Sequence, residues 1–365
     1  MATLSTAKVP PARVVRAVEG VRARLQRLNR RMVPAPIALL ELTQGSMLTQ
    51  AIYVAAELRI AEALQDGPRS PAEIARIVDA HPEAVYRLLR LLASHKIFAE
   101  QKDGRFALTP MADALREDSP NSMRGIAVLM GHPIHWEDWS HLVDSVRTGE
   151  PSLPKLRGMG AYEYLAANPE YGAVFFAGMG NLSSLETVPI LAAYDFSTFG
   201  TIVDVGGGGG ALLAAILQRA KKSRGVLFDS RAVASGAEAV LAEAGVADRC
   251  TIEDGGLFDP VTQGGDAYLL KHIIHDWPET QAQEILRNLR KAMSPDSRLL
   301  LMEFVTPQDG RDHPAKLVDL WLMLLVGGKE RTETQYAELF ASTGFRLERV
   351  VPTVSALAIV EARPV

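Results

Sequence analysis

Cysteine is nearly absent from this sequence, and long apolar runs are missing. The 365 residues contain one cysteine, Cys250, so no disulfide can form within the chain, and a reducing compartment is expected. The longest apolar run, residues 317–326, is interrupted by Asp319 and is shorter than the ~18 residues that cross a bilayer. We therefore expect a cytoplasmic protein without a membrane partner.

The sequence also lacks a strong excess of either charge. It has 39 Lys and Arg residues against 43 Asp and Glu, and its formal net charge of −4 argues against general affinity for nucleic acid. The first 35 residues differ, because their eight basic side chains face one acid, Glu19. An arginine-rich, acid-poor start resembles a transit peptide, but it has no apolar core of signal-peptide type. A tail leading into an exposed amphipathic helix is therefore the preferred interpretation.

Glycine, in contrast, is abundant, and five consecutive glycines mark the stretch around which the chain is organised. Thr201–Val205 is a β-branched run typical of a buried parallel strand, and Ala211–Arg219 is rich in helix formers. Between them the glycines let the backbone turn sharply and approach a ligand without an intervening Cβ. The pattern predicts the first crossover of a nucleotide-binding α/β domain.

The glycine turn fits two kinds of ligand. Gly206, Gly208 and Ala211 match the dinucleotide fingerprint G-x-G-x-x-A, as in a nicotinamide dehydrogenase. Gly206, Gly208 and Gly210 match the D-x-G-x-G-x-G turn that binds S-adenosylmethionine. Asp204 favours the second ligand, because a carboxylate can meet a cationic sulfonium but would repel a pyrophosphate.

Residues 37–115 have the pattern of a winged helix. Apolar residues recur at helical spacing over 37–64, Ser70-Pro-Ala-Glu73 is a capping box, and residues 81–92 predict a second helix. Residues 98–108 then predict a hairpin that turns at Asp103-Gly104. A ligand-sensing DNA regulator would share this pattern, but the second helix is more apolar than a groove reader needs. Burial against a second subunit accounts for it better.

The segment between Met111 and Asp195 is helical and rich in aromatic residues and methionine. Most of these side chains should be core, and a minority should line an apolar pocket for a flat aromatic substrate. They are Met130, His132, His135, Trp136, Trp139, Tyr162, Tyr164, Phe175, Phe176 and Met179.

The remaining residues predict a doubly wound α/β domain, because strands and helices alternate. Strands are expected at 225–229, 251–253, 267–274 and 298–304, helices at 232–244, 280–293 and 333–343, and a hairpin pairs 347–351 with 356–361.

Marked residues follow the predicted parallel strands, at the sheet edge where ligands bind in such folds. Asp204, Asp229, His275 and Glu303 all fall there. Asp229 can bind two ribose hydroxyls. The His275 imidazole can take a proton from a phenol, and a carboxylate such as Glu303 beside it would fix its tautomer and favour its charged form. No cluster has metal-ligand spacing, so no metal is expected.

Four motifs in order resemble a known family. They are Asp204-Val-Gly-Gly-Gly-Gly-Gly210, Leu270-Lys-His-Ile-Ile-His-Asp-Trp277, Leu301-Met-Glu303 and Gly327-Gly-Lys-Glu-Arg-Thr332. Over residues 37–363 the chain resembles the small-molecule O-methyltransferases of the plant caffeate and bacterial antibiotic-tailoring type. The resemblance implies a winged-helix dimerisation domain (1–115), a helical region contributing to the substrate pocket (116–195) and a Rossmann-like, class I S-adenosylmethionine-binding domain (196–365). It also implies a homodimer.

The resemblance further implies a role for each matching residue. His275 would be the general base, with Glu303 and Glu330 flanking it and orienting the imidazole. The product of the cofactor would be S-adenosylhomocysteine, and the acceptor a phenol of a phenazine, polyketide or other secondary metabolite. The expected cofactor residues are Ser183, Asp204, Gly206, Gly208, Gly210, Asp229, Gly256, Leu257 and Lys271, the last near the adenine; the expected substrate residues are Met130, Phe175, Met179, Trp321, Met323 and Leu325.

One position departs from the family pattern. Where the family has Gly-Asp-Phe-Phe, this chain reads Gly255-Gly-Leu-Phe258, so the carboxylate that normally accepts from the adenine amino group is missing at Gly256. Asp254 could substitute for it, or the contact could pass to the backbone or to water.

Overall fold

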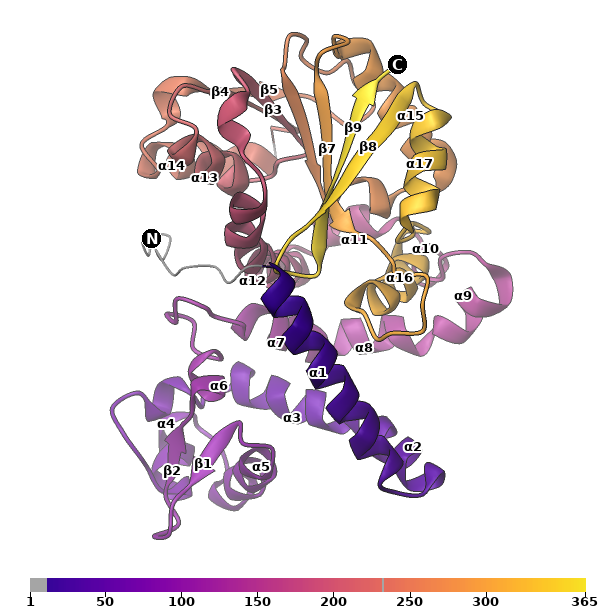
Figure 1. Ribbon diagram of the computed structural model, residues 1–365. Coiled ribbons are helices and arrows are strands. Elements are labelled where there is room, and N and C mark those ends of the chain that lie inside the picture. Colours follow the sequence, from indigo (N-terminus) through magenta and orange to yellow (C-terminus); the bar gives the residue numbers. More distant parts are fainter. Residues whose placement is uncertain (1–11, 232) are drawn as a thin grey trace. The chain divides into compact units, whose positions relative to one another are not determined.

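The computed structural model describes residues 12–231 and 233–365 (Figure 1). These residues form two compact units. The first comprises Arg24–Val143 and Leu156–Leu185, and the second comprises residues 12–23, Asp144–Lys155 and Glu186–Val365. The division into segments 1–115, 116–195 and 196–365 stays a prediction.

The first unit begins with the expected helix–helix–hairpin pattern. Ser70 caps α4 (Pro71–Ile77): its hydroxyl accepts from the Glu73 N–H, and the Glu73 carboxylate accepts from the Ser70 N–H at 2.7 Å. Helix α5 (Pro82–Ser94) follows, and β1 (Phe98–Glu100) pairs antiparallel with β2 (Phe106–Leu108). The winged-helix prediction is therefore confirmed.

The core of this unit joins the winged helix to the helices on either side of it. Leu89, Leu92 and Phe106 are fully buried against α3 (Gly45–Glu57) and its neighbours. Gly131 lies so close to α3 that a Cβ there would be 2.1 Å from that of Tyr53. The other helices with residues in this unit are α1 (Ala12–Arg31), α2 (Ala35–Thr43), α6 (Pro110–Asp113), α7 (Arg124–Gly131), α8 (Pro133–Ser140), α9 (Leu142–Thr148), α10 (Leu153–Arg157), α11 (Ala161–Ala167) and α12 (Pro169–Ala193).

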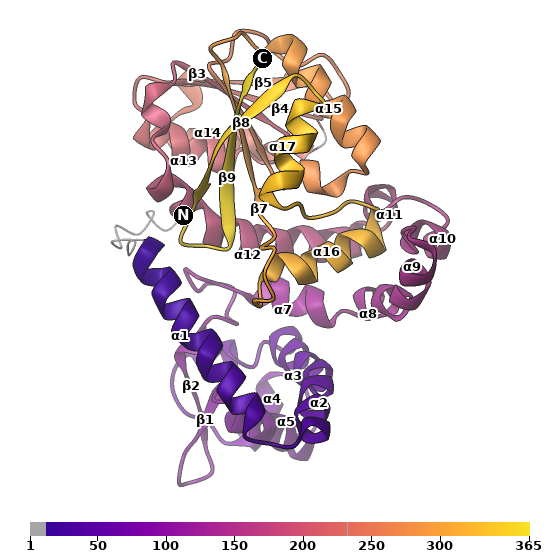
Figure 2. The ribbon, with the colours of Figure 1, turned by 45° about the vertical axis from the view of Figure 1, so that its right-hand side comes forward.

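The second unit is built on a 7-stranded sheet of order β5-β4-β3-β6-β7-β9-β8. The strands from β5 to β7 are parallel, and β9 and β8 add an antiparallel pair. Helices α13 and α14 cover one face, and α15 and α17 cover the other (Figure 2). The doubly wound prediction is confirmed. The strands are β3 (Thr201–Val205), β4 (Arg224–Asp229), β5 (Cys250–Asp254), β6 (Ala267–Lys271), β7 (Arg298–Phe304), β8 (Phe345–Pro352) and β9 (Leu357–Pro364); the helices are α13 (Ala211–Arg219), α14 (Ala237–Glu243), α15 (Glu279–Ala292), α16 (Pro314–Leu325) and α17 (Glu333–Ala341).

Two predicted elements have different bounds. The strand expected over 267–274 ends at Lys271, because His272 takes a φ of 54°, and Ile274–Asp276 form a single 3₁₀ turn. The helix expected over 232–244 starts as a 3₁₀ turn at Val233–Gly236 and becomes α-helical only at Ala237. Glycine is a poor helix former, and Gly236 stands at that junction.

Helix α12 is, within the described residues, the one helix long and apolar enough to cross a membrane. This differs from the expectation that no such segment exists. The buried carboxylate of Glu186 on α12 binds Lys271 at 2.9 Å, and Gly178 packs closely against Leu129. A buried charge paired within the protein favours a helix packed against protein over one exposed to lipid.

Candidate active site

The carboxyl ends of four neighbouring parallel strands place the predicted polar residues at one edge of the sheet. Asp204 precedes the last residue of β3, Asp229 ends β4, His275 follows β6 and Glu303 lies near the end of β7. The strands pair in the order β4-β3-β6-β7. This edge is therefore where the second unit can perform chemistry.

His275 is held by a carboxylate from outside the sheet. Its Nδ1 lies 2.7 Å from Oε1 of Glu330, which belongs to the loop between α16 and α17. Both side chains are buried, and the Glu330 backbone N–H donates to Asp319 at 2.8 Å. The other ring nitrogen, Nε2, lies 3.4 Å from Asp276. Glu330 thus selects the tautomer with a proton on Nδ1, and Nε2 is the basic nitrogen.

The buried carboxylates raise the pKa of His275. Burial alone would lower it, but Asp276, Glu330 and Glu303 outweigh burial and raise the pKa to about 10. Burial also raises the pKa of Glu330 to about 7, so the two side chains compete for one proton. We assign that proton to the imidazole, because it is the group that has several carboxylates around it.

The hydrogen bonds of Glu303 go to the backbone before the imidazole and to a tyrosine, so its orienting role on the ring stays a prediction. Its Oε1 accepts from the backbone N–H groups of Ile273, Ile274 and His275, at 3.2, 2.6 and 3.2 Å. Its Oε2 accepts from the hydroxyl of Tyr336 at 2.7 Å. Glu303 is fully buried, so it fixes the backbone turn on which His275 stands.

Two residues that the sequence did not point to complete this turn. Burial raises the pKa of Tyr336 well above its usual value, so its hydroxyl stays protonated and can donate to Glu303. Arg331, which is 1% exposed, donates to the carbonyl of Ile274 at 3.3 Å. The sequence could have indicated them, because Arg331 lies within the 327–332 motif and Tyr336 lies just after it.

The glycine turn opens α13 in a conformation that favours glycine. Gly206, Gly208 and Gly210 have φ values of 71°, 59° and 75°. Asp229 supports the turn, because its Oδ2 accepts from the Gly208 N–H at 2.8 Å. The turn thus presents backbone at the start of a helix, as nucleotide sites do.

Asp204 lies beneath the glycine turn, and its side chain is buried. A Cβ on Gly207 would be 2.5 Å from Asp204 Oδ2, and the residue is 1% exposed. Oδ2 has no hydrogen-bond partner among the described residues. Burial, only partly offset by Lys271, raises the pKa of Asp204 to about 7.

Lys271 belongs to a cluster that the sequence did not predict. Its ammonium lies 2.9 Å from Glu186, and the same carboxylate lies 3.0 Å from Nε2 of His272. The ring of His272 is 5.0 Å from that of His275. Lys271 ends β6, between the glycine turn that follows β3 and the turn that carries His275. Its charge also lowers the pKa of Asp204. Asp229, at the end of β4, lies on the other side of β3.

Comparison with known proteins decides what this edge does. Residues 139–346 match the O-methyltransferase domain, and residues 40–118 match the O-methyltransferase dimerisation domain. The chain belongs to this family. It is an S-adenosylmethionine-dependent O-methyltransferase.

Its relatives match over nearly their whole length. A phenazine O-methyltransferase of Lysobacter antibioticus is 41% identical over 333 residues, 91% of this chain and 97% of its own. A mitomycin biosynthesis 6-O-methyltransferase of Streptomyces lavendulae is 39% identical, over 88% and 93%. An O-methyltransferase from neocarzinostatin biosynthesis, solved with S-adenosylmethionine and 2-hydroxy-5-methyl naphthoic acid, is 31% identical over 87% and 96%, with a TM-score of 0.74.

The residues of this methyltransferase suit the cofactor. The orphaned oxygen of Asp204 beneath the turn, the glycines with positive φ and Asp229 together offer acceptors and open backbone. A Cβ on Gly206 would come within 2.6 Å of the Ile273 side chain, so the packing at this turn admits only glycine.

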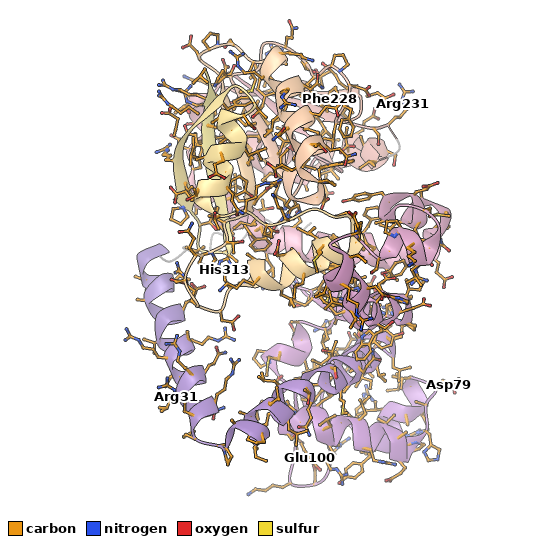
Figure 3. The ribbon with its side chains drawn as sticks, turned by 90° about the vertical axis from the view of Figure 1, so that its right-hand side faces the viewer. Arg31, Asp79, Glu100, Phe228, Arg231 and His313 are labelled. Atoms are coloured by element: carbon orange, nitrogen blue, oxygen red, sulfur yellow. The ribbon has the colours of Figure 1, made fainter. Side chains whose placement is uncertain are left out.

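The loop after β5 places the carboxylate of Asp259 beside Gly256, where the family acid is missing. Gly256 donates its N–H to Oδ2 of Asp259 at 2.7 Å, and a Cβ on Gly256 would lie 3.2 Å from that oxygen. Asp254, the expected substitute, accepts from the N–H of Arg231 at 2.8 Å. Arg231 follows β4 beyond Phe228 and points outward (Figure 3).

The predicted substrate residues of the methyltransferase fall in both units. Met130 lies on α7, and Phe175, Met179 and Ser183 lie on the part of α12 that belongs to the first unit. Trp321, Met323 and Leu325 lie on α16, in the second unit. All six substrate residues are half-buried, and their common pocket stays a prediction.

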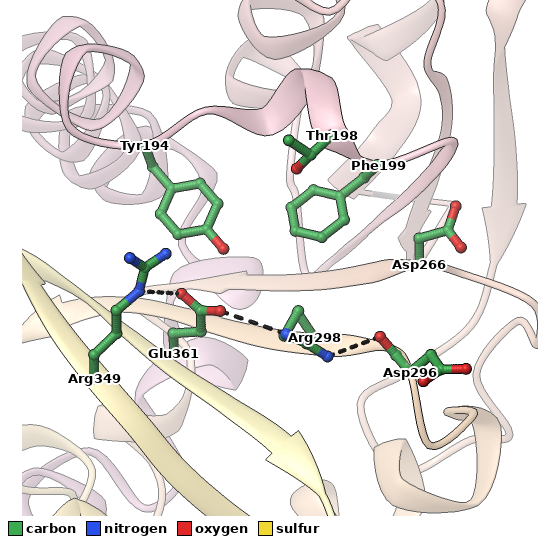
Figure 4. Close-up of a pocket in the computed structure, with 8 residues that line it drawn as sticks. All are labelled: Tyr194, Thr198, Phe199, Asp266, Asp296, Arg298, Arg349 and Glu361. Carbon is green, nitrogen blue, oxygen red and sulfur yellow. Dashed lines mark hydrogen bonds and ion pairs between the residues drawn. The ribbon is translucent and has the colours of Figure 1, made fainter.

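A separate pocket of about 470 Å³ lies at the opposite, amino-terminal edge of the same sheet (Figure 4). Its charged groups already pair: Glu361 lies 2.7 Å from Arg349 and 3.5 Å from Arg298. It lies where β6 begins, whereas His275 follows the end of that strand. Its lining is Tyr194, Thr198, Phe199, Asp266, Asp296, Arg298, Arg349 and Glu361.

Proposed function

We propose that this enzyme methylates a phenolic hydroxyl of a flat aromatic secondary metabolite, such as a phenazine or polyketide, and that His275 is the general base. The pairing of His275 with Glu330 at the carboxyl edge of the sheet carries the proposal. The relatives support the substrate class, because their names refer to phenazine and mitomycin.

His275 acts through Nε2. Because Nδ1 keeps its proton against Glu330, Nε2 is the nitrogen that gains a lone pair when the imidazolium loses a proton; this neutral form, which the raised pKa of His275 shifts to alkaline pH, removes the phenol proton. The imidazolium that forms is stabilised by the same carboxylate, and the acceptor oxygen becomes the nucleophile. S-adenosylmethionine, when bound, supplies a methyl group that is attached to a cationic sulfur, and once the methyl group is transferred the sulfur leaves as part of a neutral thioether.

The cofactor is held, in this proposal, by residues around the glycine turn. Gly206, Gly208, Gly210 and Ser183 would bind the methionine end, and Asp229 the ribose hydroxyls. Gly256 and Leu257 would border the adenine. Lys271 pairs with Glu186, and its charge lowers the pKa of Asp204 beneath the glycine turn, so we place it near the methionine end and not near the adenine.

We also propose that the enzyme is a cytoplasmic homodimer that binds neither nucleic acid nor membranes. The match to the dimerisation domain supports the dimer. Exposed apolar residues in that domain, such as Leu42, Met47 and Leu91, support it too.

Replacement of His275 tests the mechanism. His275→Ala should lower turnover by about 10²–10⁴ and leave S-adenosylmethionine affinity nearly unchanged. The loss should be smaller for phenols that are already ionised at the assay pH, since they need no base. If His275→Ala keeps full activity on a phenol of pKa about 10, the base assignment is wrong.

A further inference from the structure

Helix α1 carries a regular row of exposed apolar side chains. Val14, Val18, Val21, Leu25 and Leu28 on the helix and Met32 just after its end, here called the α1 seam, are between 47% and 69% exposed. They follow one another at intervals of four, three, four, three and four residues. This is the spacing of the a and d positions of a coiled coil, with Val18, Leu25 and Met32 at a.

The shape of the α1 seam favours a partner helix over a lipid surface. It is a narrow a/d stripe of valine, leucine and methionine, whereas helices that lie on membranes have a broad apolar face with bulky aromatic residues. Arg22, Arg24 and Arg31 border the seam, and none of them forms an ion pair with the described part of the chain.

We propose that α1 pairs in parallel with α1 of a second copy of the chain, as a two-stranded coiled coil. This inference rests on the proposed homodimer and extends it beyond the dimerisation domain. The exposed apolar surface continues along the chain from α1 towards the dimerisation domain, because Ile37, Leu39 and Leu40 on α2 are also exposed. Residue 40 is where the match to the dimerisation domain begins.

The bordering arginines select the parallel arrangement. Parallel pairing would set Arg24 opposite Asn29, and Ala17 opposite Arg22, so no arginine faces another. An antiparallel pair centred on the seam would set Arg22 against Arg22 and Arg24 against Arg24. Repulsion between like charges therefore acts against that alternative.

The α1 pair would lie outside the residues that match the dimerisation domain. The matches to the family begin at residue 40, after α1 ends at Arg31. The alignment with the Lysobacter relative covers 97% of that protein and 91% of this chain.

Cysteine cross-linking in the full chain tests the pairing. Cys250→Ser removes the one native thiol, and single cysteines are then placed by Val18→Cys, Leu25→Cys and Met32→Cys at the a positions. Gln26→Cys, one residue from Leu25 but outside the seam, is the matched control. Mild oxidation should give disulfide-linked dimers with the three seam variants and at least about tenfold less with the control, because the a and d positions, and not the outer positions, bring the same residue of both copies within disulfide range.

Light scattering of the uncross-linked protein separates this inference from the proposed dimer. A dimer mass without seam cross-links leaves the homodimer standing and overturns the α1 pairing. A monomer mass overturns both. Cross-linking at Leu25 but not at Val18 and Met32 overturns the parallel register, since antiparallel helices bring each residue near itself only at the centre. Flotation with phosphatidylserine vesicles that Leu25→Asp abolishes, without seam cross-links, assigns the seam to lipid and also overturns it.

Discussion

The carboxyl group of Asp204 is buried beneath the glycine turn, where its ionisation opposes folding. Burial raises its pKa to about 7 from an ordinary value near 3.8, so the folded state holds this proton more tightly than the unfolded state. The protonated carboxyl of Asp204 therefore makes its full contribution to the free energy of unfolding below the unfolded pKa, and this contribution is lost as pH rises from about 4 to 7. Ionisation of Asp204 should lower the free energy of unfolding by about 4 kcal/mol across that window.

We expect Asp204→Asn to flatten the dependence of melting temperature on pH between 5 and 8, because an amide does not ionise. The native enzyme should lose stability over that range, and it should lose less when S-adenosylmethionine is bound, since a cation near the turn favours the carboxylate. Scanning calorimetry across pH measures both effects. Parallel curves for enzyme and variant would show that Asp204 is already ionised at pH 5.

Glu330 and Glu303 act on His275 in different ways, and conservative replacements should separate them. Glu330→Gln removes a carboxylate that raises the pKa of His275, so the basic form of the imidazole appears at lower pH. The acid limb of the kcat profile should shift by about 1 unit or more to lower pH. A pH–rate profile of the variant on one phenol measures this shift.

Glu303→Gln should lower turnover with a smaller change in that profile. The amide oxygen can still accept from the N–H groups of the His275 turn, so the turn is weakened but kept. Tyr336→Phe is the matched change on the other side of Glu303, and it should act in the same direction. Equal pH shifts for Glu303→Gln and Glu330→Gln would contradict the division of roles.

The sequence identified the residues of the catalytic edge better than their contacts. Asp204, Asp229, His275 and Glu303 could be placed together because parallel strands end at one edge. The hold of Glu303 on three backbone N–H groups could not be foreseen, since it depends on His272 leaving the β conformation. Contacts of that kind join residues some thirty positions apart and have no local sequence pattern.

At the scale of elements, a substitution in the loop after β5 can measure how the missing family acid at Gly256 affects cofactor affinity. Gly256→Asp would restore the family residue, but its side chain would start 3.2 Å from the carboxylate of Asp259. We expect S-adenosylmethionine binding to weaken by about 1–2 kcal/mol from repulsion between the two acids. Titration calorimetry measures the affinity.

Removing the neighbouring acid supplies the control for this loop. In the Asp259→Asn background, Gly256→Asp should be neutral or favourable, and Asp259→Asn alone should weaken binding if Asp259 has taken over from the family acid. Gly255→Ala should disturb the loop in any background, because its Cβ would meet the Phe228 ring at 2.2 Å. A loss caused by Gly256→Asp in both backgrounds would show that the backbone, and not Asp259, requires glycine.

Elements were predicted well where side-chain periodicity or capping determines them. The capping box at Ser70 and the strand Arg298–Phe304 follow from sequence alone. The end of β6 did not, because long-range bonds to Glu303 and Arg331 stabilise the turn that replaces its last residues. The apolar length of α12 was also missed, since Glu186 divides its sequence although the helix continues through it.

At the scale of the whole molecule, composition indicates that the enzyme needs a partner surface. Its N-terminal helices leave large apolar side chains in solvent, among them Leu40 at 53% exposure on α2. A monomer would expose this surface permanently, which is uncommon for soluble chains. The sequence predicted this apolar excess, but in the proposed homodimer the surface that covers it would lie in a second copy of the chain and therefore outside any single-chain pattern.

We therefore expect light scattering at micromolar concentration to give about twice the 39.6 kDa of the chain. Leu40→Glu should shift the protein towards monomer, because it places a charge where the proposed dimer would bury apolar surface. Glu41→Gln, the neighbouring change on the same helix, should leave the mass unchanged. Because dimerisation stabilises by mass action, the melting temperature of the native enzyme should also rise with protein concentration, whereas that of a monomeric variant should not. A native mass near that of one chain, with a melting temperature independent of concentration, would show that the exposed apolar residues of α2 serve another purpose.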